Sequence, residues 1–465
     1  MVEFDRELKN YETPIDGLVV YDLPVHGDSR GWFKENWQRE KMVAANLPDF
    51  GPVQNNISFN DKRGVARGIH AEPWDKYVSL ATGKVFGFWV DIREGSKTYG
   101  QVFTTELDPS KAIFVPRGVA NGYQTLEDNT AYTYLVNDHW SPDAAYSFVS
   151  MFDESLGIEW PIPLAESEVS EKDRNHPLLA DAGAIRPKKV LITGANGQLG
   201  QALQALYADA DCVDRDTLDI SSPEVFTARR WKDYGLILNA AAYTAVDLAE
   251  TDGRADAWSA NAVAVANLAQ IARDNGITLV HISSDYVFDG TRDNHAEDEP
   301  FAPLGVYGQT KAAGDIAAGM APQHYILRTS WVIGKGNNFV RTMKSLADRG
   351  IEPSVVSDQI GRLTFTDDLA TATKHLVDTK APYGTYNLSN DGEPASWADI
   401  AKAVYKLAGH DENEVTGVTT AEYYAGKTDI APRPLKSTLD LTKIKSTGFT
   451  PRNWREALND YYKIS

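Results

Sequence analysis

A serine, a tyrosine and a lysine in the second half of the chain have the spacing of a proton-transfer site. Ser284 ends the apolar stretch "TLVHISS" (278–284), and "PLGVYGQTK" (303–311) holds Tyr307 and Lys311 four residues apart. If Tyr307 begins a helix, Lys311 lies one turn further on the same face, where its ammonium would lower the pKa of the phenol. Ser284 would then hydrogen-bond a substrate carbonyl while Tyr307 protonates the alkoxide that hydride transfer leaves. The alternative is a Tyr and a Lys that merely decorate a helix.

A glycine-rich turn precedes this set and favours the catalytic interpretation. "VLITGANGQLG" (190–200) places Gly194, Gly197 and Gly200 directly after an apolar stretch and at the start of a helical one. Such a turn lets the backbone approach a pyrophosphate at a helix N-terminus, although it also serves simply to join a strand to a helix. Roughly twenty residues on, Asp214 is placed to accept from a ribose hydroxyl and Arg215 to pair with a 2′-phosphate.

The first half of the chain carries a different set of chemical groups. His70 lies in "GVARGIHAE" (64–72), and Lys76, Tyr134 and Asp153 follow on separate segments. A lone histidine in a β domain is usually structural. Together, however, these groups are sufficient to move a proton α to a ketone: His70 abstracts, Asp153 holds its tautomer, Lys76 stabilises the enolate oxygen and Tyr134 returns the proton. This chemistry requires no cofactor.

The elements that must position these groups change in character near residue 187. Residues 18–160 consist of short β-rich runs separated by Gly, Pro, Asp and Asn, which is typical of an antiparallel barrel or jelly roll. From residue 188 onward, apolar strands alternate with Ala-rich helical stretches, which predicts βαβ units and a parallel, doubly wound sheet. We therefore expect an all-β domain over 1–182, ending in a short helix, a linker at 183–187, and an α/β domain over 188–465 with a small C-terminal substrate-binding subdomain.

Composition limits the partners of the protein. The 465 residues carry a formal net charge of −19, which argues against general affinity for nucleic acid or an anionic membrane. Cys212 is the single cysteine, and the sequence has neither a signal-peptide pattern at its start nor an apolar run of membrane-spanning length. We expect a soluble cytoplasmic protein.

The second half resembles the extended short-chain dehydrogenase/reductases and, among them, the dTDP-4-dehydrorhamnose reductases. The resemblance rests on "GANGQLG", "NAAAYTAVDLAE", "SSDYVFDG", "PLGVYGQTKAAGD" and "DQIGRLTFTDDLA". It implies Ser284, Tyr307 and Lys311 as the catalytic set. It further implies that Asp285, Tyr286 and Trp331 lie near the sugar, with Asn338 and Arg433 near the nucleotide.

Residues expected to contact the cofactor, NADPH or NADH, are Gly194, Asn196, Gly197, Gln198, Leu199, Gly200, Asp214, Arg215, Ala240, Ala241, Tyr307 and Lys311. Some family members bind magnesium through an acid after the glycine turn; "GQLGQAL" has none, so no metal is expected.

The first half is similar to the dTDP-4-dehydrorhamnose 3,5-epimerases over residues 14–182. The supporting stretches include "GDSRGWFKENW", "GVARGIH" and "SEKDRNHPLLADA". This resemblance implies a cupin-like jelly roll, phosphate contacts from Arg30 and Arg67, and a nucleotide-sugar pocket that includes Glu35, Asn56 and Trp140. The sequence departs from the family in having Asn121 where a histidine is usual, Leu135 where a lysine is common, and "QNNIS" in place of Gln-Asp-Asn-His.

The two resemblances together imply a bifunctional enzyme that makes dTDP-L-rhamnose for polysaccharide synthesis. The epimerase would invert two carbons of dTDP-4-keto-6-deoxyglucose, and the reductase would then reduce the C4 ketone. A homodimer formed through the barrel is expected. Three alternatives stay open: a non-catalytic scaffold, a reductase whose barrel serves only for dimerisation or sugar binding, and a single-site epimerase leading to another deoxyhexose.

Overall fold

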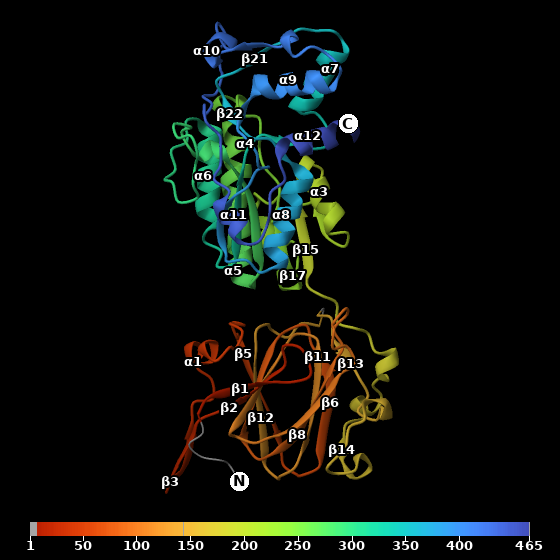
Figure 1. Ribbon diagram of the computed structural model, residues 1–465. Helices are drawn as coiled ribbons and strands as arrows, with labels where there is room; N and C mark the ends of the chain where they lie inside the picture. The colour runs from red at the N-terminus through yellow and green to blue at the C-terminus, as the bar shows by residue number, and fades with distance from the viewer. Residues whose placement is uncertain (1–6, 143, 465) are drawn as a thin grey trace. The chain divides into compact units, whose positions relative to one another are not determined.

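The computed structural model describes residues 7–142 and 144–464, and its chain forms two compact units. The first unit ends at Pro187 and the second begins at Lys188. The first is built almost entirely of strands, and the second alternates strands with helices (Figure 1). The fold class expected for each half of the sequence is therefore confirmed.

The first unit is an antiparallel barrel made of two sheets. One sheet has the order β1 (Lys9–Glu12), β2 (Val19–Asp22), β10 (Lys111–Val115), β7 (Lys76–Thr82), β12 (Thr130–Val136) and β5 (Gln54–Asn60). The other has the order β13 (Ser147–Phe148), β6 (Val65–Ala71), β11 (Val119–Thr125), β8 (Val85–Asp91) and β9 (Val102–Leu107), with β14 (Glu168–Val169) parallel to β6. A hairpin of β3 (Val25–Asp28) and β4 (Gly31–Lys34) extends from the barrel (Figure 1).

Successive side chains along the barrel strands point alternately into the barrel and away from it, which gives one interior layer and two outer layers. On β8, Trp89 belongs to the interior cluster, whereas Phe88 and Val90 belong to a cluster on the outer side of their sheet. On the other sheet, Tyr77 packs outward with residues around α1 (Arg39–Ala44), and Val78 packs inward. The period of two in the sequence thus produces three apolar layers from two sheets.

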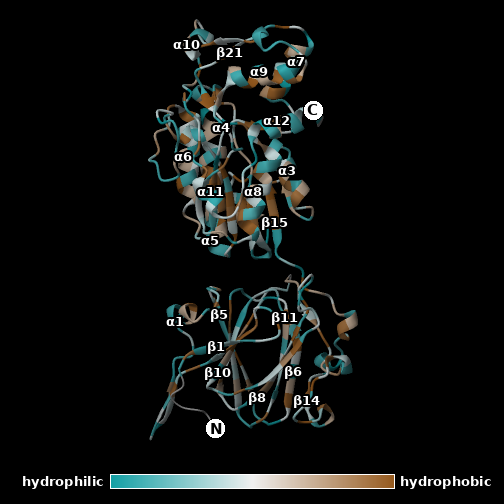
Figure 2. Cartoon of the chain, in the orientation of Figure 1, coloured by the Kyte–Doolittle hydropathy of each residue, from teal (hydrophilic) through white to brown (hydrophobic). Residues whose placement is uncertain are grey.

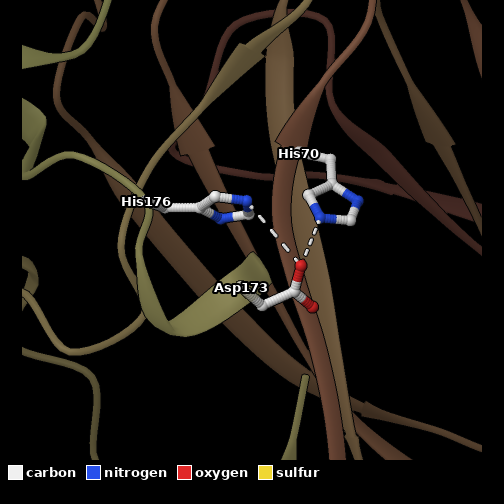
Figure 3. Close-up of side chains that lie close together, drawn as sticks. All are labelled: His70, Asp173 and His176. Atoms are coloured by element: carbon white, nitrogen blue, oxygen red, sulfur yellow. Dashed lines mark hydrogen bonds and ion pairs between the residues drawn. The ribbon is translucent and has the colours of Figure 1, made fainter. Parts of the chain in front are cut away.

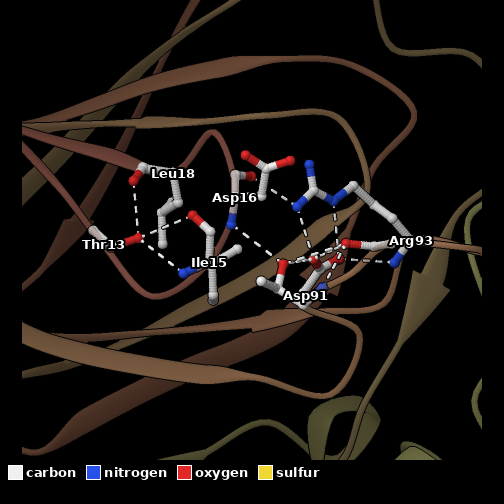
Figure 4. A network of polar contacts seen from close by, with 8 residues as sticks. Thr13, Ile15, Asp16, Leu18, Asp91 and Arg93 are labelled. Atoms are coloured by element: carbon white, nitrogen blue, oxygen red, sulfur yellow. Dashed lines mark hydrogen bonds and ion pairs between the residues drawn. The ribbon is translucent and has the colours of Figure 1, made fainter.

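A buried carboxylate at one end of the barrel ties a loop to β8. Asp91 accepts from the guanidinium of Arg93 and from the hydroxyls of Ser96 and Thr98 (Figure 4). Burial alone would raise the pKa of Asp91, but these bonds outweigh it and lower the pKa to about 2. Arg93 also donates to the backbone oxygen of Asp16, which holds the loop before β2 in place.

The segment after the last long strand covers the outer face of the second sheet. The helix expected near residues 168–182 is short: α2 spans Glu171–Arg174 and a 3₁₀ turn spans Leu179–Asp181. Within the segment expected to be a linker, 183–187, Ile185 is 3% exposed and its backbone bonds to Ile92 and Glu94. Leu179 and Ala182 pack in the same outer cluster as Ile185, and these apolar contacts hold the chain on the barrel up to this point.

The second unit is built around a parallel six-stranded sheet. Its order is β16 (Asp211–Val213), β15 (Lys189–Thr193), β17 (Tyr234–Asn239), β18 (Thr278–Ser284), β19 (His324–Thr329) and β24 (Gly384–Asn387). Every pairing is parallel, so each connection between neighbours must cross over a face of the sheet.

Helices cover both faces of this sheet. The helices are α3 (Gln198–Leu206), α4 (Arg254–Trp258), α5 (Ala264–Asn275), α6 (Val306–Ala318), α8 (Thr366–Asp378) and α11 (Thr442–Ser446), with a π-helical turn at Ser259–Val263 between α4 and α5. Leu191 of β15 packs with α5, and its neighbour Ile192 packs with α3 and α8 on the opposite face. Hydrophobic residues accordingly dominate the strands, as the brown colour of β15 shows (Figure 2).

The remaining C-terminal elements form a smaller subdomain with its own core. Its helices are α7 (Phe339–Asp348), α9 (Trp397–Leu407), α10 (Thr420–Tyr423) and α12 (Trp454–Ile464), and its short strand pairs are β20 (Val332–Ile333) with β23 (Thr364–Phe365), β21 (Ser354–Val356) with β26 (Thr416–Val418), and β22 (Ile360–Gly361) with β25 (Ala395–Ser396). Val340, Val404 and Trp454 join α7, α9 and α12 in one cluster. Among the described residues, no helix combines the length and the apolar character that crossing a membrane requires.

Candidate active sites

The parallel sheet brings Ser284, Tyr307 and Lys311 together. Ser284 is the last residue of β18, and Tyr307 and Lys311 lie in the first two turns of α6, which packs on β18. The expected order of a strand end followed by a helix start is thus present. Ser284 and Lys311 are both buried, and the Lys311 ammonium donates to the backbone oxygen of Ile282 at 2.6 Å.

Burial controls the ionisation of this set. It raises the pKa of Tyr307 to about 12, although a hydrogen bond with Ser284 lowers it in part. It lowers the pKa of Lys311 to about 8, against the raising effect of Asp315. The expected lowering of the tyrosine pKa by the lysine is therefore not what this ligand-free structure shows, because desolvation of the phenolate is the larger effect.

Asp285 and Tyr286 lie directly against the catalytic set. The Ser284 hydroxyl donates to the Asp285 carboxylate at 3.0 Å, and the ring of Tyr286 meets that of Tyr307 edge-on at 5.3 Å. Burial raises the pKa of Asp285 to about 6, against hydrogen bonds from Ser437 and Ser284 that lower it.

Two residues without an assigned role in the sequence analysis position α6. The Glu250 carboxylate accepts from the backbone N–H of Val306, the first residue of α6, at 2.7 Å. The Asn261 amide donates to Thr310, whose hydroxyl in turn donates to the backbone oxygen of Tyr307. Glu250 ends the quoted stretch "NAAAYTAVDLAE", but nothing in that stretch indicates which helix it contacts.

A cavity of about 350 Å³ lies at the glycine turn. Seven of the expected cofactor residues line it, namely Gly194, Asn196, Gly197, Asp214, Arg215, Ala240 and Ala241. Gly194 has φ +64°, and a Cβ there would lie 2.6 Å from the backbone nitrogen of Ala241, so no larger residue fits. A Cβ on Gly200 would lie 2.2 Å from the Gly194 oxygen, which explains how closely α3 approaches the turn. Size, glycine backbone and helix start all fit a dinucleotide.

The other expected cofactor residues have structural roles or lie outside this cavity. The Leu199 side chain packs in the core beneath α3, and the Gln198 side chain accepts from the backbone N–H of Gly334. Tyr307 and Lys311 are not among the lining residues. At the far end, Asp214 accepts from the Asn196 amide at 2.6 Å, and the Arg215 side chain is 75% exposed.

A second cavity, of about 430 Å³, lies in the C-terminal subdomain. Tyr286, Trp331 and Arg433 line it, as expected for residues near a sugar nucleotide. Trp331 stacks on Trp397 at 3.9 Å, and Arg433 forms an ion pair with Asp247. Asn338 was also expected here, but it does not line the cavity.

Asn338 serves instead as the N-cap of α7. Its side-chain oxygen accepts from the backbone N–H of Arg341, and its amide donates to Gly334 and Tyr461. The amide is therefore already used locally, which is the usual role of an asparagine before a helix.

In the barrel, a cavity of about 190 Å³ gathers the groups expected to move a proton. Arg67 and His70 come from β6 of one sheet, and Lys76 and Tyr134 come from β7 and β12 of the other. The cavity is thus lined by strands of both sheets.

The acid that holds His70 is Asp173, and the expectation of Asp153 was wrong. The Asp173 carboxylate is 3.1 Å from His70 Nε2 (Figure 3). It also accepts from the backbone N–H of Gly68. Burial alone would raise the pKa of Asp173, but the bonds from His70 and Gly68 hold it below its usual value. Asp153 instead caps a 3₁₀ turn and accepts from the backbone N–H groups of Ser155 and Leu179. The quoted stretch "SEKDRNHP" contained Asp173, but its pairing with a strand a hundred residues earlier is a tertiary feature.

The groups opposite His70 form a linked set. Lys76 makes an ion pair with Glu72, donates to the Asn121 side-chain oxygen at 2.8 Å and lies 5.6 Å from the Tyr134 ring centre. Burial raises the pKa of Tyr134, and the Glu72 carboxylate raises it further. The sequence did not indicate Glu72 as a residue of this site. The unusual Asn121 therefore orients the lysine.

The remaining residues expected to bind the sugar nucleotide lie outside this cavity in the single chain. Arg30 forms an ion pair with Asp28 on the exposed β3–β4 hairpin. Glu35 pairs with Lys41, and Asn56 accepts from Gln54 on the edge strand β5. Trp140 is 66% exposed.

These features define a nicotinamide-dependent oxidoreductase unit of the short-chain type, joined to an antiparallel barrel with a histidine–aspartate proton-transfer site. Comparison with known proteins gives the families. The model for the RmlD substrate binding domain matches residues 188–465, and the model for dTDP-4-dehydrorhamnose 3,5-epimerase matches residues 12–181. The chain belongs to the RmlD reductase family in its second half and to the dTDP-4-dehydrorhamnose 3,5-epimerase family in its first half. Both resemblances seen in the sequence are confirmed.

Individual relatives cover each half almost completely. The protein RmlC homolog of Streptococcus pyogenes serotype M6 is 54% identical over 39% of this chain and 93% of its own length. The dTDP-4-dehydrorhamnose reductase of Aggregatibacter actinomycetemcomitans is 40% identical over 58% of this chain and 97% of its own length. The structure of the Bacillus anthracis dTDP-4-dehydrorhamnose reductase in complex with NADP has a TM-score of 0.55 at 36% identity, over 60% of this chain and all of that one.

Proposed function

We propose that the protein is a bifunctional enzyme that epimerises C3 and C5 of dTDP-4-keto-6-deoxyglucose and then reduces the C4 ketone to give dTDP-L-rhamnose. The observation that carries this proposal is the presence of two complete proton-transfer sites in one chain, each within a unit of the matching family. The product of the first reaction is the substrate of the second. Fusion supplies both activities in equal amounts.

In the epimerase step, His70 is the base that removes the proton next to the ketone. Asp173 bonds one ring nitrogen and so leaves the other for proton transfer. The Lys76 ammonium stabilises the enolate oxygen, and Tyr134, on the opposite sheet from His70, returns a proton from the other face.

Asn121 supports this assignment even though it is unusual for the family. Its oxygen accepts from Lys76 and thereby directs the ammonium. An asparagine lacks the positive charge of an imidazolium, so we expect slower but working epimerisation.

In the reductase step, bound NADPH or NADH supplies a hydride to C4. Ser284 donates to the carbonyl oxygen, Tyr307 gives its proton to the developing alkoxide, and Lys311 assists from the adjacent turn of α6. Burial raises the pKa of Tyr307 to about 12, so the tyrosine carries its proton at neutral pH, and the Lys311 ammonium on the next turn would favour release of that proton to the alkoxide. The cavity at the glycine turn would hold the dinucleotide, with Arg215 at the adenosine end favouring NADPH.

The decisive test supplies the full-length protein with dTDP-4-keto-6-deoxyglucose in heavy water. Without NADPH, deuterium should enter at both C3 and C5; with NADPH, nuclear magnetic resonance should identify dTDP-L-rhamnose. Exchange at one carbon would instead favour the single-site epimerase. Reduction without any exchange would favour a barrel that only binds or dimerises, and neither reaction would favour a non-catalytic scaffold.

We also propose that the protein dimerises through the barrel. Strand β5 lies at the edge of its sheet and exposes Ile57 (68%) and Phe59 (54%), and the β3–β4 hairpin exposes Phe33 (70%). Exposed apolar side chains on an edge strand are typical of a surface that pairs with another chain. Phe59→Lys should convert the dimer to a monomer in sedimentation velocity.

A cytoplasmic location fits the exposed free thiol of Cys212.

A further inference from the structure

A third side chain with metal-binding chemistry lies beside the His70–Asp173 pair. His176 follows α2, and its Nε2 is 3.7 Å from the same Asp173 oxygen that contacts His70 at 3.1 Å (Figure 3). One ligand atom from each of the three residues lies within 4.8 Å of the others. Among the described residues, this is the one such group of three found.

Neither the fold nor the proposed epimerisation explains His176. Its side chain is 5% exposed. A contact with the Val149 backbone raises its pKa against the larger lowering effect of burial, but within the described part of the chain neither ring nitrogen makes a hydrogen bond of ordinary geometry. The ring is held by stacking on Phe148 at 4.8 Å and by an edge contact with His70 at 5.4 Å. A buried imidazole without a well-formed hydrogen bond is costly, so a ligand that accepts its lone pair would relieve that cost.

The geometry suits a tetrahedral transition-metal ion. Zinc binds imidazole nitrogen and carboxylate oxygen at about 2.0–2.2 Å, which places neighbouring ligand atoms about 3.3–3.5 Å apart. The two distances to Asp173 lie on either side of that range, and the two imidazoles need to approach by little more than about 1 Å. The second oxygen of Asp173 accepts from Gly68, which orients the carboxylate as outer contacts do in metal sites.

We propose that His70, Asp173 and His176 form an inhibitory site for Zn²⁺ in the epimerase unit. The ion takes the place of the proton shared by His70 and Asp173, and that proton is released to solvent. His70 is then a metal ligand and has lost the carboxylate that holds it, so it cannot act as the base. This inhibition rests on the proposed function, whereas the binding site itself does not.

The same chain provides an internal control. The reductase set of Ser284, Tyr307 and Lys311 contains no histidine, so zinc should leave that activity intact. The two activities are separable by assay: deuterium exchange reports the epimerase, and reduction of NADP⁺ by dTDP-L-rhamnose reports the reductase in reverse.

The test titrates Zn²⁺ into the metal-stripped full-length protein by calorimetry and follows both activities. We expect one ion per chain at this site, loss of exchange, recovery with a chelator and unchanged reductase activity. His176→Phe keeps an aromatic ring against Phe148 and should raise the zinc concentration for half-inhibition at least about tenfold. His139→Phe, the same change at an exposed histidine, should leave it unchanged.

Three outcomes would overturn the proposal: a wild-type protein that binds no zinc, a His176→Phe variant that binds and is inhibited like the wild type, or a wild type that binds zinc without losing deuterium exchange. For each variant, the rate of deuterium exchange in the presence of zinc is compared with the rate of the same variant without metal. If His176→Phe does not fold, the visible spectrum of the wild-type protein with Co²⁺ is the test instead. Co²⁺ in a four-coordinate site with two imidazoles absorbs distinctively, whereas octahedral or unbound Co²⁺ does not. Zinc binding without inhibition would show that the site exists and that His70 is not the base.

Discussion

The two candidate active sites differ in how their groups are brought together. In the reductase unit, the proposed catalytic set lies within residues 284–311, on one strand end and the helix that packs against it. In the barrel, the groups come from β6, β7, β12 and α2, spread over residues 67–173. A local constellation can be identified from spacing alone, whereas a dispersed one depends on which strands the fold places together.

The proposed base of the barrel is more exposed than the reductase groups. Ser284 and Lys311 are 7% and 2% exposed, whereas the His70 side chain is 35% exposed and lines an accessible cavity. Desolvation has the largest effect on the pKa values of Tyr307 and Lys311. The barrel groups are organised by direct contacts, such as those of Asp173 with His70 and of Lys76 with Glu72 and Asn121.

The largest expected effect tests whether the two sites work independently. Tyr307→Phe removes the proton donor and should slow reduction about 10²- to 10⁴-fold, yet leave deuterium exchange into the sugar. His70→Ala should abolish exchange and spare NADP⁺ reduction by dTDP-L-rhamnose. An equimolar mixture of the variants should again make dTDP-L-rhamnose; a mixture that makes none would refute separable sites.

The next effect distinguishes the two barrel carboxylates. Asp173→Asn removes the charge that holds His70 and should slow exchange about 10²- to 10⁴-fold, by analogy with other histidine–carboxylate pairs. Asp153→Asn is the matched control, because that carboxylate only caps a turn. Its exchange rate should stay within a few fold of the wild type. A larger loss from Asp153→Asn than from Asp173→Asn would reverse the assignment.

Stability should depend on pH with opposite signs in the two units. Asp91 has its pKa lowered to about 2, so its contribution is present above pH 4 and disappears as the pH falls toward 2. Asp91→Asn should therefore cost the barrel about 2 kcal/mol at pH 7.

Asp285 is the opposite case, because burial raises its pKa to about 6 and its ionised form opposes folding above that pH. Asp285→Asn should stabilise the second unit by about 2–3 kcal/mol at pH 7 and have little effect at pH 4. Denaturant unfolding at pH 2, 4 and 7, followed by probes in each unit, measures the two effects. Equal shifts for Asp285→Asn at pH 4 and pH 7, or for Asp91→Asn at pH 2 and pH 7, would exclude ionisation as the cause.

The smallest effect concerns cofactor choice. Arg215 is exposed at the adenosine end of the cavity, so Arg215→Ala should raise the KM for NADPH about tenfold and leave that for NADH nearly unchanged. Steady-state kinetics with both cofactors decide the point. The same increase for both would mean that Arg215 does not contact the 2′-phosphate.

Much of the molecule was predictable from sequence because the signals are local. The period of two in the barrel strands, the alternation of strands and helices after residue 188, and the glycine turn each reflect contacts between residues near in the chain. The reductase set was predictable for the same reason, since a spacing of four on a helix places Tyr307 and Lys311 on one face. That residues 183–187 lie against the barrel was not predictable, because the burial of Ile185 depends on packing with residues distant in the sequence.

By itself, the sequence determined the two fold classes, the reductase set and four of the residues that line the barrel cavity. Only the tertiary structure decided that Asp173 rather than Asp153 holds His70, that Asn338 caps a helix, and that His176 lies beside the catalytic pair. The physical reason is that a carboxylate binds whichever donor the fold places within about 3 Å. The separation of two residues along the chain does not determine how far apart they lie in the folded structure.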